Sequence, residues 1–194
     1  MAILATYRDN LSRRQDLLVQ SNVHSLRQAL RLLGHMEDAI YTQSPPGFAP
    51  HRVGGHLRHI LEFYECFLDG IESRYIDYDA RKRDESIEAS RRVAMARIRA
   101  IIERLENTPA IGGDSVLWVR MEDSRDGLVS DPFLPSSPGR ELQVLSSHTI
   151  HHFALIAMTL TAHGASVDRD FGMAPSTLRY AASKRTQHST PEAA

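Results

Sequence analysis

The sequence has little of several features that would assign it to a special class of protein. Of its 194 residues only Cys66 is a cysteine, which excludes an internal disulfide framework and suggests a reducing compartment. Its formal net charge of -1 provides no overall field toward nucleic acid or an anionic membrane. The first eight residues lack the pattern of a secretory signal, and the most apolar run, 153–162, is about half as long as a membrane-spanning helix. We therefore expect a cytoplasmic globular protein that binds a small molecule or another protein, without a nucleic-acid or membrane partner.

Helical periodicity is what the sequence does contain. The chain is long enough to bury a sizeable core as one domain, which we expect over residues 1–180, with a disordered tail at 181–194. Four amphipathic helices are predicted at about 12–41, 51–73, 85–106 and 137–163. Together they predict an all-α four-helix bundle, a fold that builds metal and cofactor sites from inward side chains on facing helices.

Local signals suggest where these helices begin. Ser12 is one candidate cap for the first helix, and Ser21 is another. Asp84 is placed to cap the third helix, and Ser137 followed by Pro138 is a typical start for the fourth.

The segment between the third and fourth helices has a different character. Residues 116–121 are rich in β-branched and aromatic side chains, and the turn signal Asp126-Gly127 precedes Leu128 and Val129. This pattern predicts a short β-hairpin.

Histidines are frequent, ten in all, and two groups of them fall within predicted helices. His148 and His152 are four residues apart, so both imidazoles lie on one helical face, where they can bind one metal ion. A third ligand is needed, and His56 and His59 on the second helix are the candidates.

A helical wheel at about 100° per residue separates these histidines by their angle from the apolar stripe. His56 lies about 70° away and His59 about 130° away. On the fourth helix, His152 lies about 65° away, His148 about 105° and His151 about 165°. The wheel thus selects His56, His148 and His152 as metal ligands and excludes His59 and His151. The alternative is that these are core-edge histidines satisfied by ordinary hydrogen bonds.

Other reactive side chains have simpler interpretations. Glu62, Glu65 and Cys66 are expected on the outer, solvated face of the second helix, so no catalytic base or nucleophile is assigned. Arg58 and the basic residues 81–83 could receive an anionic substrate, but salt bridges with neighbouring aspartates are their expected role.

The spacing of an aromatic residue and histidines resembles a known family. Phe48, His56 eight residues later, and the downstream stretch 148–152 resemble the DinB/YfiT-like superfamily of bacterial four-helix-bundle metalloproteins. The resemblance covers about residues 18–163 and implies the ligand role for His56, His148 and His152. A tryptophan is usual in that superfamily at the position of Phe48.

The resemblance also implies a class of chemistry. It suggests a divalent metal ion, zinc or nickel, and a hydrolase or thiol-S-transferase activity toward a small molecule such as a low-molecular-weight thiol. Three neutral imidazoles leave a coordination position open, as in catalytic zinc sites. Bundles of this kind often pair, so a homodimer is expected. The alternative is a non-catalytic stress-response or binding module in which the histidines are vestigial.

Overall fold

The structure is a computed structural model that describes residues 2–47, 49–112, 115–121 and 132–188. It is mostly helical, with a small three-stranded sheet. The α-helices are α1 (Ala2–Gly34), α2 (Asp38–Thr42), α3 (Val53–Gly70), α4 (Glu85–Ala89), α5 (Arg91–Asn107), α6 (Pro138–Ala162) and α7 (Pro175–His188). The short 3-10 helices are η1 (Tyr78–Ala80) and η2 (Pro109–Gly112), and the strands are β1 (Tyr75–Asp77), β2 (Leu117–Arg120) and β3 (Leu134–Ser136).

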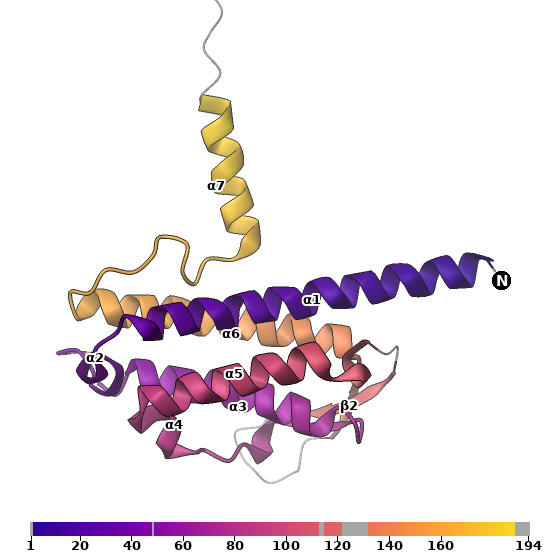
Figure 1. Cartoon of the computed structure of the whole chain (residues 1–194), viewed down its shortest axis with the longest axis horizontal. Helices are drawn as coiled ribbons and strands as arrows, with labels where there is room; N and C mark the ends of the chain where they lie inside the picture. The colour runs from indigo at the N-terminus through magenta and orange to yellow at the C-terminus, as the bar shows by residue number, and fades with distance from the viewer. Residues whose placement is uncertain (1, 48, 113–114, 122–131, 189–194) are drawn as a thin grey trace, which may run out of the picture.

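Helix α3 is the central element of the fold. It packs against α4, α5, α6 and β1, while α1 packs against α5 and α6 (Figure 1). Because neighbours lie on several sides of α3, its buried residues are not limited to one stripe. Glu62 and Glu65 are only 2% and 9% exposed, so the expected solvated outer face of this helix was wrong.

The predicted helices are present, and their boundaries differ in instructive ways. Ser12 and Ser21 both lie inside α1, so neither caps it. The third predicted helix is divided into α4 and α5 at Ser90, whose side chain accepts a hydrogen bond from the backbone N–H of the first turn of α5. The predicted caps Asp84 and Ser137 are confirmed, since each accepts a backbone N–H at the start of its helix.

The sheet agrees with the predicted hairpin only in part. Strand β2 falls within 116–121 and pairs antiparallel with β3, Trp118 opposite Pro135. The expected turn at Asp126-Gly127 and the strand residues 128–129 lie outside the described residues. Strand β1, which pairs parallel with β2, was not predicted because three residues are too few to show a period-2 pattern.

The C-terminal region contains one aromatic packing contact and a further helix. Phe171 stacks on Phe153 of α6, with ring centroids 4.5 Å apart. Helix α7 then extends to His188 and stands apart from α1 and α6 (Figure 1), and it includes residues 181–188 of the expected tail. Residues 189–194 lie outside the described part of the chain. Within that part, no helix combines the length and apolarity needed to cross a membrane.

Candidate metal centre

A buried polar network fixes the register of α3 and α6. The Tyr64 hydroxyl donates to Asn22 Oδ1 at 2.7 Å and lies 3.1 Å from Thr149 Oγ1. The Asn22 amide in turn donates to the Leu142 carbonyl of α6 at 3.0 Å. Buried polar groups require partners, so the network specifies one alignment of these helices. Because Thr149 directly follows His148, this alignment brings the histidines of α6 against α3.

Four imidazoles meet between α3 and α6. His59, His148 and His152 each offer a ring nitrogen, and these atoms all lie within 4.8 Å of one another. His148 Nε2 is 3.1 Å from His59 Nε2, and His152 Nδ1 is 3.1 Å from His56 Nδ1. All four side chains are half-buried. The histidine cluster, as we call these four residues, has the size of a mononuclear metal site.

The geometry adds His59 as a candidate for the third ligand. His148 and His152 come together as predicted, whereas the residue that completes the group of three is His59 and not His56. The wheel excluded His59 because it assumed that a residue far from the apolar stripe of α3 faces water. In the structure that side of α3 meets α6, so His59 lies beside His148 and is not on a solvated face. His151, also excluded, is exposed and lies outside the group.

The electrostatic environment keeps these histidines neutral. Burial, together with neighbouring positive charges, lowers the pKa of His59 and of His148 to about 4 and that of His152 to about 3. The pKa of His56 is also lowered, mainly by burial. At neutral pH each ring therefore keeps a nitrogen lone pair, which is the form that binds metal ions.

The donor set fits a divalent metal ion. Three imidazole nitrogens are the ligand set of many catalytic zinc sites, and imidazole also suits nickel. Two buried ring nitrogens, His148 Nδ1 and His56 Nε2, have no hydrogen-bond partner within the described residues. Two nitrogens of the cluster thus lack the partner that buried polar groups usually have.

An aromatic ring and a cation border the cluster. The Phe63 ring lies 4.2 Å from the His148 ring and 4.9 Å from the His59 ring, and the Arg81 Cζ lies 4.7 Å from the Phe63 centroid. The Arg81 charge contributes to the low pKa values of His59 and His148. Phe63 was not predicted as part of the site, although its position four residues after His59 places both on one helical face.

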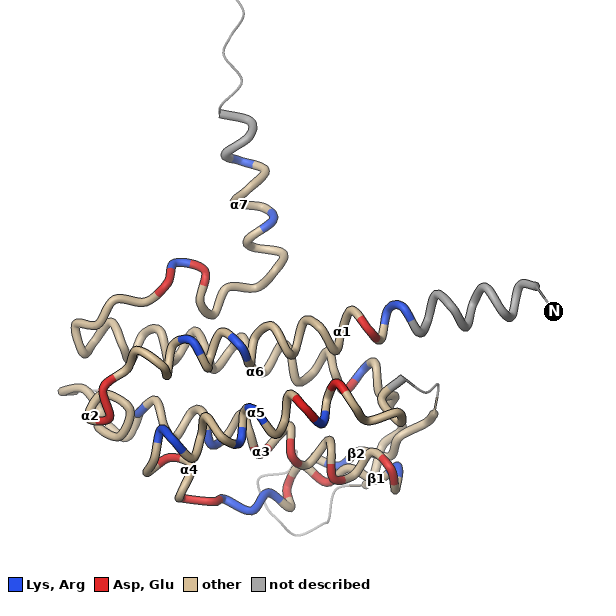
Figure 2. The backbone as a smooth tube through the Cα atoms, viewed as in Figure 1, with Lys and Arg blue, Asp and Glu red and all other residues tan. Residues whose placement is uncertain are grey.

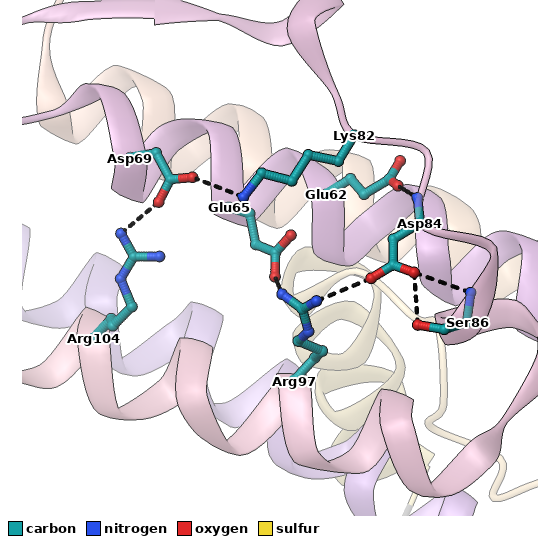
Figure 3. Close-up of polar contacts among 8 residues, drawn as sticks. All are labelled: Glu62, Glu65, Asp69, Lys82, Asp84, Ser86, Arg97 and Arg104. Atoms are coloured by element: carbon teal, nitrogen blue, oxygen red, sulfur yellow. Dashed lines mark hydrogen bonds and ion pairs between the residues drawn. The ribbon is translucent and has the colours of Figure 1, made fainter.

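The other candidates have structural roles. Glu62 accepts a hydrogen bond from the backbone N–H of Asp84 at 2.6 Å, and Glu65 pairs with Arg97 at 2.7 Å (Figure 3). Burial raises the pKa of the Cys66 thiol to about 11, so it is not a ready nucleophile. These residues hold the fold together and do not contact the cluster. Phe48, the aromatic residue of the family pattern, lies outside the described residues.

The chain is similar to part of a known protein. No family model matches the chain, and no solved structure matches it. A protein of Rhizopus delemar named FK506-binding protein 5 is 37% identical over 106 residues, which are 54% of this chain and 27% of that protein. The chain therefore spans about a quarter of the length of this relative.

Proposed function

We propose that this protein is a metal-dependent enzyme of the hydrolase or thiol-S-transferase type, built on a four-helix bundle of the DinB/YfiT-like kind. The four helices of that bundle would be α1, α3, α5 and α6, which pack on one another in pairs. The observation that carries the proposal is the group His59, His148 and His152, three half-buried imidazoles within 4.8 Å. Helical bundles commonly place metal sites on facing helices in this way.

The residues define what such a site can do. His148 and His152 would hold a zinc or nickel ion together with His59, while His56 supports His152 through their 3.1 Å contact. A divalent ion bound there would supply Lewis acidity to a substrate or to a nucleophile. The described part of the chain places no carboxylate in the group, so all three protein donors are neutral and the ion would retain its full charge. This charge favours anionic ligands and thiolates.

A second candidate function is a binding module without catalysis. The pairs His59–His148 and His56–His152 each bring two ring nitrogens within 3.1 Å, a distance at which one neutral imidazole can donate to another. In that case the two imidazole pairs are structural polar contacts between α3 and α6, and they need no ion.

Metal content separates these two functions. Protein purified without an affinity tag should contain about one divalent ion per chain by elemental analysis, and His148→Ala should contain none. His151→Ala is the matched control, because His151 is an exposed histidine on the same helix outside the group, and it should keep the ion. Wild-type protein that stays metal-free at saturating zinc and nickel would overturn the metal-dependent enzyme.

A further inference from the structure

Arg81 is a cation that has no counter-ion within the described residues. Its neighbours are paired: Lys82 with Asp69 and Arg120 with Asp77. Two of the aspartates expected to pair with residues 81–83 therefore pair with other arginines: Asp77 with Arg120 and Asp84 with Arg97. Arg81 itself is half-buried and appears in none of the ion pairs among the described residues. A partly desolvated cation without an anion costs free energy, so an anion from outside the chain would stabilise it.

The contacts of Arg81 hold its guanidinium in place and leave one edge available. Nη1 donates to the carbonyl of Tyr78 at 2.5 Å, and the guanidinium carbon lies over the ring of Phe63. These two contacts restrict the side chain before any ligand arrives. The edge formed by Nε and Nη2 has no hydrogen-bond partner in the described part of the chain. This edge matches the two oxygens of a carboxylate.

The position of Arg81 relates it to the histidine cluster. Phe63 contacts the guanidinium and also the rings of His148 and His59, so one aromatic ring separates the cation from two of the candidate ligands. A small molecule that reaches the cluster at one end would therefore have Arg81 within reach at the other, with the Phe63 ring beside it. The basic residues of this connection appear in blue between η1 and α4 in Figure 2.

We propose that Arg81 is the anion-binding residue of the candidate metal centre, so that the substrate is a small organic acid whose carboxylate pairs with the Nε–Nη2 edge. This inference rests on the proposed function, because it requires that one end of the ligand binds a metal ion at the histidine cluster. The other end is then assigned to Arg81. The anion would neutralise a region that otherwise combines a divalent ion, neutral imidazoles and an unpaired guanidinium. Charge-assisted bidentate pairing adds orientation as well as affinity.

The test compares two thiols of the same carbon number, one ending in a carboxylate and the other in a neutral hydroxyl group. Zinc-loaded protein is titrated by calorimetry with 3-mercaptopropionate and with 3-mercapto-1-propanol, which have the same number of carbon atoms. We expect the carboxylate to bind at least about 10-fold more tightly, as is typical of a charge-assisted pair. In Arg81→Gln this preference should fall to about 2-fold, whereas Arg81→Lys should retain part of it. Arg83→Gln, which removes the same charge from an exposed residue of the same connection, should keep the wild-type preference.

Zinc content and thermal unfolding of every variant are measured first. If the wild type binds zinc but shows equal affinity for the two thiols, or if Arg81→Gln retains a folded, zinc-loaded protein with an unchanged preference, the Arg81 inference is wrong and the metal centre stands. If the wild type binds no zinc, both proposals are overturned.

Discussion

Helix α3 has two polar sides, and they are built from different kinds of contact. On the side toward α5, Glu65 and Asp84 pair with Arg97, and Asp69 pairs with Arg104 and Lys82 (Figure 3). On the side toward α6, the polar groups are the four imidazoles of the histidine cluster. One side consists of opposite charges that neutralise one another, and the other of neutral donors gathered without a carboxylate.

This difference indicates what each side is for. Ion pairs that connect α3 with α5 and with the start of α4 are complete, so a ligand would gain little there. In the histidine cluster, by contrast, two ring nitrogens are buried without a hydrogen-bond partner among the described residues. The first side stabilises the helix packing, and the second is the candidate site.

The largest effect that tests this comparison is the loss of a metal ligand. His59→Ala should weaken zinc binding by more than about 100-fold. Mutation of a residue that only holds a metal ligand in place already lowers metal affinity by about 10–100-fold. His56→Ala should cost about 10-fold or less, because His56 contacts His152 but lies outside the group of three. Competition with a zinc chelator measures both affinities. If His56→Ala weakened zinc binding more than His59→Ala, the third ligand would be His56, as the helical wheel predicted.

The sequence was sufficient for much of this arrangement because its main signals are local. The helices show 3.6-residue periodicity, Asp84 and Ser137 are recognisable caps, and the pair His148 and His152 follows from their spacing. These features depend on residues within one or two turns of each other. They can therefore be predicted without knowledge of what packs against the helix.

Features that depend on neighbours were not predictable from the sequence in the same way. The wheel placed Glu65 and His59 in water because it contains no information on how many elements surround α3. Arg81 was expected to pair with aspartates nearby in sequence, but Asp77 pairs instead with Arg120 of β2. Tertiary packing decides which side chains are buried and which charged residues pair. The sequence shows only which residues are present.

The histidine cluster and the ion-paired side of α3 affect stability in different pH ranges. In metal-free protein, the pKa values of about 4 for His59 and His148 lie below the unfolded value of about 6.5, so the unfolded chain binds more protons between these limits. The contribution of these two neutral histidines to the free energy of unfolding is therefore fully present above about pH 6.5, and it is lost as the pH falls toward 4. The pKa of Asp84, lowered mainly by hydrogen bonds from Ser86, affects stability only below its unfolded value of about 3.8.

Urea unfolding at intervals between pH 7 and pH 4.5 checks this expectation. His148→Gln should show a shallower loss of stability than the wild type, because one of the titrating groups is removed. Bound zinc should delay the loss, since the ion competes with protons for the same nitrogens. A wild-type free energy of unfolding that is constant over this range would show that these histidines are not shielded as the structure indicates.

The smallest effect concerns the ion-paired side and should leave the site untouched. Arg97→Met removes the partner of Glu65 and Asp84, at 2.7 and 2.9 Å, and Glu65 is then buried without a cation. Because the Arg97 side chain is 39% exposed, water screens these pairs, and we expect a cost of only about 1–2 kcal/mol in urea unfolding.

Arg27→Met is the control: it breaks a pair with Glu106 in which the arginine is 52% exposed, and it should cost about 0.5 kcal/mol or less. Both variants should bind zinc with wild-type affinity, because neither arginine contacts the cluster. If Arg97→Met lowered zinc affinity as far as His59→Ala does, the two sides of α3 would be coupled, and the ion pairs would have to be counted as part of the site.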